Sequence, residues 1–172
     1  MKVLLIITTG ILAFITMIFL IKNLRTPVFS DDDILLQLAV FPFSTTDDSY
    51  LIEIDANDVI RTSLGTRRIP EPENMDDFFI GAARQRTTKL TSENIQYILR
   101  QAEELDASDH PLKRGYEQRE PFALGVWIMV LYYNGNFYEI AQGQYDRVGF
   151  LSNLVNKIIE LSPINIYLRG FS

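Results

Sequence analysis

The chain has 172 residues, with 16 basic and 22 acidic side chains, one histidine, no cysteine and a formal net charge of −6. Lys2, Lys22 and Arg25 are the only charged residues before position 31, so residues 31–172 hold 13 basic and 22 acidic residues and a formal charge of −9. This acidity argues against a nucleic-acid partner. The lack of cysteine excludes disulfides, thiol catalysis and thiolate metal sites.

Residues 3–21 form an uncharged apolar run, VLLIITTGILAFITMIFLI. A helix of this length rises about 28 Å, close to the hydrocarbon thickness of a bilayer. The run therefore predicts a transmembrane helix after a short flank at 1–2, with the lipid bilayer as its partner. A linker at 22–33 follows, in which Pro27 discourages a continuous helix.

The flanks of this run favour an uncleaved signal-anchor over a cleaved signal peptide, which stays the alternative. A cleavage site needs small residues in an A-x-A-like pattern, and the sequence that follows is KNLRTPVFS. The basic residues on the two sides are nearly balanced, so charge alone leaves the orientation open. The short N-terminus is typical of a signal-anchor, which predicts a single-pass protein whose domain lies outside the cytoplasm.

Four strands are expected in the first half of the domain. The run ILLQLAVFPF is apolar at nearly every position, which predicts a strand buried on both faces, or a strand that leaves the membrane and joins a sheet. The next strand alternates apolar and polar residues and returns through a turn to form a hairpin. The fourth is predicted to carry Arg84 and Arg86 on one face. The predicted ranges are 34–43, 50–55, 59–65 and 78–88.

The second half is predicted to contain two helices and a hairpin. The first helix begins at the capping residue Thr91, and the second covers 148–161, each with one apolar stripe. Between them, strands within 126–142 flank Asn134-Gly135, the preferred pair for a type I′ turn. Residues 164–168 are expected to form a short last strand or a packed tail.

The expected order is thus four strands, a helix, two strands and a helix. This pattern predicts an α+β fold in a single domain, 34–172, built as an antiparallel sheet of five or six strands with both helices packed on one face. The domain is long enough for one hydrophobic core and too short for two.

Arg61, Arg84 and Arg86 are the candidate ligand-binding residues. If the third and fourth strands are neighbours, these arginines are expected to meet on one face and hold a carboxylate or a phosphate. The alternative is structural, because such arginines commonly pair with acids across strands, here Glu53 or Glu139.

No catalytic residue, metal site or cofactor is predicted. His110 is the only histidine and lies in a polar loop, and the acidic runs lack the spacing of a calcium loop. The aromatic residues around the second hairpin are expected to lie in the core, or to form a partner surface.

The sequence therefore predicts a membrane-anchored binding or accessory domain with a possible membrane-protein partner. The alternatives are an enzyme that uses carboxylates and arginines, and a structural subunit of a membrane complex.

Overall fold

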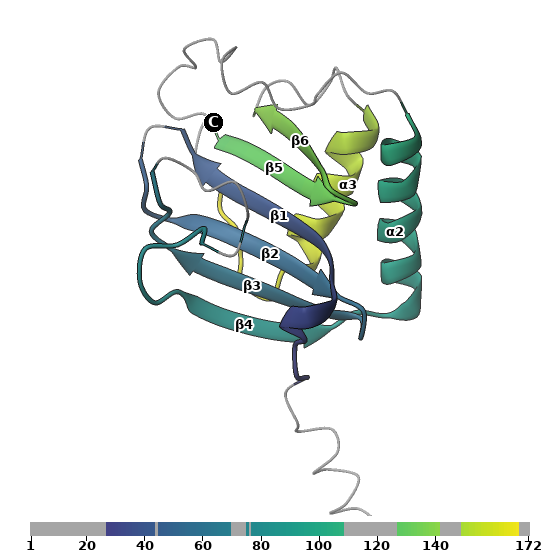
Figure 1. Cartoon of the computed structure of the whole chain (residues 1–172), viewed down its shortest axis with the longest axis horizontal. Helices are drawn as coiled ribbons and strands as arrows, with labels where there is room; N and C mark the ends of the chain where they lie inside the picture. Colours follow the sequence, from purple (N-terminus) through teal and green to yellow (C-terminus); the bar gives the residue numbers. More distant parts are fainter. Residues whose placement is uncertain are drawn as a thin grey trace, which may run out of the picture.

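The computed structural model describes residues 27–43, 45–69, 75, 77–108, 127–141 and 149–168. Their order of four strands, a helix, two strands and a helix is the predicted one, with a short 3-10 turn before the first strand (Figure 1). The elements are η1 (Asp31–Asp33), β1 (Ile34–Pro42), β2 (Ser49–Asp55), β3 (Val59–Gly65), β4 (Arg84–Lys89), α2 (Ser92–Ala107), β5 (Trp127–Tyr133), β6 (Asn136–Ala141) and α3 (Gly149–Leu161).

The strands of the described chain form one antiparallel sheet of six, in the order β4-β3-β2-β1-β5-β6. β1 lies at the centre and pairs with β2 on one side and with β5 on the other. Its residues 36–41 are all buried, which confirms the expectation drawn from its continuous apolar run. A strand covered on both faces needs apolar residues at successive positions.

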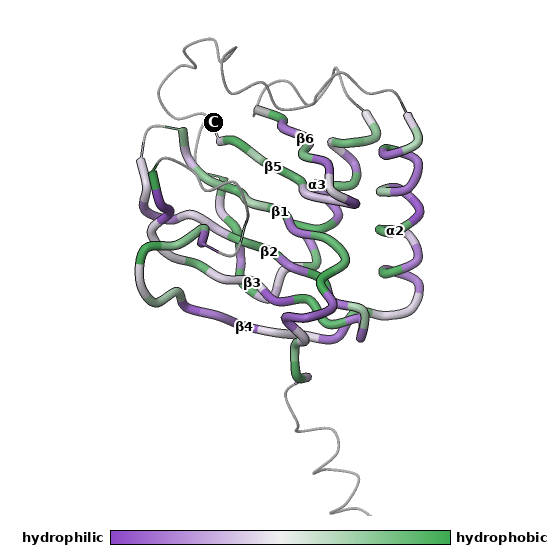
Figure 2. The backbone as a smooth tube through the Cα atoms, in the orientation of Figure 1, coloured by the Kyte–Doolittle hydropathy of each residue, from purple (hydrophilic) through white to green (hydrophobic). Residues whose placement is uncertain are grey.

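Both helices pack on the same face of the sheet, as predicted (Figure 1). The buried residues of each helix belong to its apolar stripe, and along α2 hydrophobic residues lie on the side near the sheet and hydrophilic residues on the far side (Figure 2). Burial of one large apolar side chain contributes about 1.5–3 kcal/mol, so this layer supplies most of the core. Its buried members include Leu36, Leu38, Val40, Ile52, Ile54, Ile60, Ile95, Ile98, Leu105, Met129, Leu131, Leu151, Leu154, Val155 and Ile158.

Two local signals fix the ends of these elements. The Thr91 hydroxyl accepts a hydrogen bond from the backbone N–H of Asn94 at 3.3 Å, which confirms the predicted cap of α2. Asn134 and Gly135 have φ angles of 49° and 80°, as a type I′ turn requires. The turn produces the β5–β6 register that its two-residue length predicts, with Tyr133 opposite Asn136.

The predicted fourth strand began too early. Residues 78–88 were expected to be one strand, but β4 starts only at Arg84. Phe78 is instead buried against Phe41, on the face of the sheet opposite the helices, with ring centroids 6.1 Å apart. Gly81, at a φ of 79°, lies between this anchored phenylalanine and the strand. Tertiary burial of Phe78 thus overrides the local pattern.

The last described residues are a packed tail, one of the two predicted outcomes. Ile164 joins the core, and the Thr62 and Ser162 hydroxyls are 2.9 Å apart, which ties the tail to β3. None of the helices in the described ranges is long and apolar enough to cross a membrane. The predicted transmembrane segment at 3–21 lies outside the described residues.

Candidate functional site

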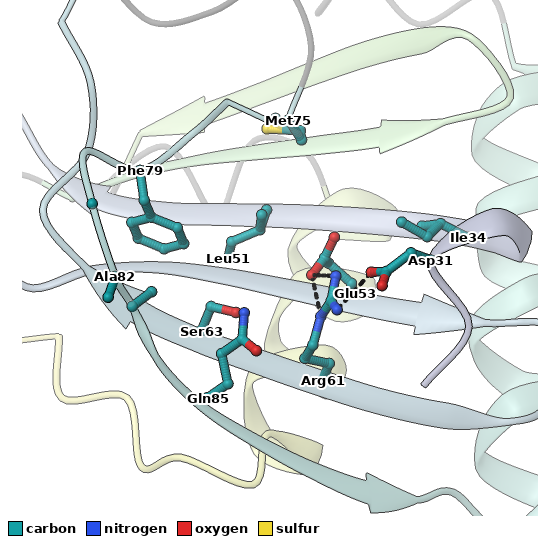
Figure 3. A pocket seen from close by; sticks show the side chains of 12 residues that line it. Asp31, Ile34, Leu51, Glu53, Arg61, Ser63, Met75, Phe79, Ala82 and Gln85 are labelled. Carbon is teal, nitrogen blue, oxygen red and sulfur yellow. Dashed lines mark hydrogen bonds and ion pairs between the residues drawn. The ribbon is translucent and has the colours of Figure 1, made fainter. Parts of the chain in front are cut away.

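Within the described residues, the face of the sheet opposite the helices is only partly covered. The segment leading from β3 to β4 folds over it, with Arg67 and Phe79 in an isolated bridge. Below this segment lies a second, smaller apolar cluster that includes Ala39, Phe41, Leu51, Met75, Phe78, Ile128 and Val130. The uncovered part of the face forms an open groove of about 610 Å³ beside it (Figure 3).

The groove has one polar end and one apolar end (Figure 3). Asp31, Glu53 and Arg61 line the polar end. Met75 and Phe79 line the apolar end, together with residues 81–83. The lining of the groove therefore changes from charged to apolar along its length.

A row of polar residues crosses the sheet at the polar end. Gln37, Glu53 and Arg61 are directly opposite one another on β1, β2 and β3. Glu53 is only 3% exposed, and it accepts hydrogen bonds from Gln37 Nε2 at 3.1 Å and from Arg61 Nε at 2.7 Å. The buried carboxylate thus has both an amide and a guanidinium partner, as a buried charge requires.

Arg61 joins this row to the segment that precedes β1. Its second guanidinium nitrogen also lies 2.7 Å from Glu53, and its third lies 2.6 Å from Asp31 in η1. The ring of Phe29 stacks on the guanidinium, 4.0 Å from its centre. Every nitrogen of the guanidinium is therefore engaged, which confirms the structural alternative for Arg61, a cross-strand pair with Glu53.

The structure does not bring the three candidate arginines together. Arg61 is opposite Thr87, whereas Arg84 and Arg86 are opposite Leu64 and Thr62, and so belong to the other face of the sheet. The convergence expected from the sequence is therefore absent. Anion binding by these residues stays a prediction without its expected geometry.

Two uncharged polar side chains on the groove floor were missed by the sequence reasoning. Ser63 on β3 and Gln85 on β4 are cross-strand partners, and neither forms a side-chain hydrogen bond with another described residue. Ser63 is 1% exposed. A signal was available for Ser63, which lies two residues from Arg61 on the same strand and so shares its face, whereas the face of Gln85 depends on the β3–β4 register.

A further set of contacts docks residues 27–33 on the domain. Asp55 is fully buried, and its carboxylate accepts the backbone N–H of Ser30 at 2.8 Å and those of Asn57 and Val59 at 2.9 Å. The N–H of Ala56 donates to the carbonyl of Asp33 at 2.9 Å. The end of the predicted linker is therefore part of the folded domain.

A second polar cluster lies at the far end of α2. The Asp106 carboxylate accepts hydrogen bonds from the Tyr138 hydroxyl at 2.9 Å and from Asn134 and Asn136 at 2.8 Å. Burial, followed by the hydrogen bond and the charge of Asp106, raises the pKa of Tyr138 to about 12. Burial also raises the pKa of Tyr133, with smaller contributions from Glu103 and Asp106. These hydrogen bonds hold the β5–β6 turn against the C-terminal end of α2.

The remaining candidates from the sequence are the acidic runs, His110 and the aromatic residues of the second hairpin. In the described ranges, no group of three or more His, Asp or Glu side chains is placed to hold a metal ion. His110 lies outside those ranges. Trp127 and Tyr138 belong to the core, as expected for these aromatics, while Tyr132 and Phe137 stack half-buried on the other face, 4.8 Å apart.

Comparisons with protein-family models, with curated protein sequences and with solved structures found no match for this chain.

Proposed function

We propose that this protein is a single-pass, membrane-anchored binding domain, held by residues 3–21 with its domain outside the cytoplasm. The observation that carries the proposal is the docking of residues 27–33. Pro27 is the first described residue, and its carbonyl accepts a hydrogen bond from the Thr87 hydroxyl at 3.3 Å. Only residues 22–26 separate the apolar run from this point, a span of roughly 18 Å at full extension.

Such a short connection holds the domain close to the bilayer surface. The acidic domain is repelled by anionic headgroups, so its role near the membrane is better explained by a protein or small ligand than by a lipid surface. The groove supports binding over catalysis, because its charged lining residues Asp31, Glu53 and Arg61 are paired with one another. None of the three is left to act alone as a general acid or base.

Membrane attachment is tested with the full-length protein expressed in cells. After alkaline carbonate washing, the protein is expected to stay in the membrane pellet, with an intact mass that includes residues 1–26. A Leu12→Lys, Ala13→Asp variant is expected to be released, because each charge in the middle of the helix costs about 2.5–3.5 kcal/mol. A wild-type chain that is washed off, or a mass lacking the N-terminus, would contradict the proposal.

Orientation and partner are tested in the same membranes. Protease added from outside is expected to degrade the domain. Cross-linking followed by mass spectrometry is expected to recover one membrane protein linked to the domain. Recovery of cross-links only through the apolar segment would favour the structural-subunit alternative.

A further inference from the structure

β4 lies at an edge of the sheet (Figure 1). In the described part of the chain it pairs only with β3, and none of the backbone hydrogen bonds outside the regular elements involves it. All six of its residues are exposed or half-exposed. An edge strand of this kind presents a row of unpaired N–H and C=O groups, which is a template for one more strand.

The side chains of this edge are basic in a domain that is acidic. Arg84, Arg86 and Lys89 lie along six residues that contain no acid, and β4 is largely hydrophilic (Figure 2). None of the three forms an ion pair or hydrogen bond with another described residue. Arg84 and Arg86 share one face and lie two residues apart, about 6.8 Å along the strand. Arg84 and Arg86 therefore place two positive charges on one face of the edge, and no acid among the described residues pairs with them.

The positive charge of β4 favours some strands over others as its pairing partner. A second copy pairing through the same edge would place two basic rows side by side, and like charges in opposing positions destabilise a sheet. An acidic extended segment would meet opposite charge with the same backbone pairing. The contact between Pro27 and Thr87 marks one end of the accessible stretch.

We propose that β4 binds an extended segment of a partner protein as a seventh strand, with acidic residues of that segment at alternate positions beside Arg84 and Arg86. The proposal deepens the binding function proposed above and names the chemistry of its partner. The other row of side chains on the added strand would lie beside Gln85, which also lines the groove. The segment is thus recognised by backbone pairing, by two arginines and by the groove edge.

The test uses the full-length protein in nonionic detergent micelles and a short fluorescent peptide with glutamates alternating with valine or threonine. Binding is measured by anisotropy at low salt. The Arg84→Ser, Arg86→Ser variant is expected to bind about tenfold more weakly or worse. The control Arg68→Ser, Arg100→Ser changes the net charge equally at exposed positions away from β4 and is expected to bind like the wild type.

Backbone pairing is tested separately from charge. A peptide with alternate amides N-methylated keeps its glutamates and is expected to lose binding. Hydrogen exchange followed by mass spectrometry is expected to show protection of residues 84–89 only with the unmodified peptide. Equal binding by the two arginine variants, or binding without protection of β4, would overturn the proposal.

The outcome is separable from that of the proposed function. A protein that stays in the membrane but does not protect β4 with any acidic peptide refutes this inference alone. A protein that binds the peptide but washes off the membrane refutes the anchoring and supports the inference.

Discussion

The buried Arg61–Glu53 pair gives the sharpest test of how this sheet face is held together. Arg61→Met removes the cation and leaves the Glu53 carboxylate buried with Gln37 as its remaining partner. Removing one member of a buried pair typically costs about 3–5 kcal/mol. Because the Arg61 side chain keeps 16% exposure, which lets water relieve part of the penalty, we expect the lower end, about 3 kcal/mol.

The matched variants separate the buried contact from the exposed one. The Asp31 side chain is 72% exposed, so Asp31→Asn is expected to cost about 0–1 kcal/mol. The double variant Glu53→Gln, Arg61→Met removes both charges and keeps an amide oxygen for Gln37. It is expected to lie within about 1–2 kcal/mol of the wild type, because no buried charge is left unpaired.

The assay is urea unfolding of the full-length protein in nonionic micelles, followed by the fluorescence of Trp127. This residue is the only tryptophan and is 5% exposed in the core, so its emission reports unfolding of the whole sheet. The reasoning would be refuted if Arg61→Met cost less than about 1 kcal/mol, or if the double variant were less stable than that single variant.

Three further predictions test the contacts of Asp55, those of Asp106, and the turn. Asp55→Ala leaves three backbone N–H groups without their acceptor and is expected to cost about 4–5 kcal/mol, the low end of the sum for three bonds to a charged acceptor, with faster proteolysis at residues 27–33 as the readout. Tyr138 stays protonated in the folded state up to about pH 12 but ionises near pH 10 when unfolded. The free energy of unfolding is therefore expected to fall as pH rises between these values. The Asp106→Asn variant should lower the pKa of Tyr138, which an absorbance titration at alkaline pH would show. Gly135→Ala forces a side chain to a φ of 80° and is expected to cost about 1–2 kcal/mol, whereas Gly149→Ala meets open space and is expected to be neutral, as thermal unfolding would show.

Much of the fold could be predicted because its signals are local. The β5–β6 register follows from a two-residue turn at Asn134-Gly135, and the start of α2 follows from the Thr91 cap. The packing of each helix against the sheet follows from its apolar stripe, since the stripe needs a partner surface. These features depend on residues close together in the chain.

The features that were missed depend on distant residues. Arg61 and Arg84 lie on opposite faces because of the β3–β4 register. The connection between these strands is long, so the sequence does not determine this register. A shift by one residue exchanges the two faces of a strand. The late start of β4 has a similar origin, since it depends on the packing of Phe78 against Phe41, which is distant in the sequence.

Glu53 shows the limit of pattern reasoning on a polar residue in a strand. Glu53 alternates with Ile52 and Ile54, which belong to the core under the helices, and so lies on the other face of the sheet. The same alternation is typical of a solvated face, but Glu53 is buried. The reason is that Gln37 and Arg61, on the two neighbouring strands, both donate hydrogen bonds to the Glu53 carboxylate. Of these two partners, only Arg61 was predicted from the sequence.

Two kinds of contact hold residues 27–33 on the domain, and their magnitudes differ. The Arg61–Asp31 pair is short, but Asp31 is exposed, so this contact contributes about 0–1 kcal/mol and weakens in salt. Asp55 is fully buried, and of the three backbone N–H groups that its carboxylate accepts, that of Ser30 belongs to this segment, whereas those of Asn57 and Val59 belong to the β2–β3 connection. Hydrogen bonds to a charged acceptor contribute about 1.5–3 kcal/mol each. The position of the linker is therefore set by Asp55, whereas Arg61 chiefly neutralises Glu53 beneath the groove.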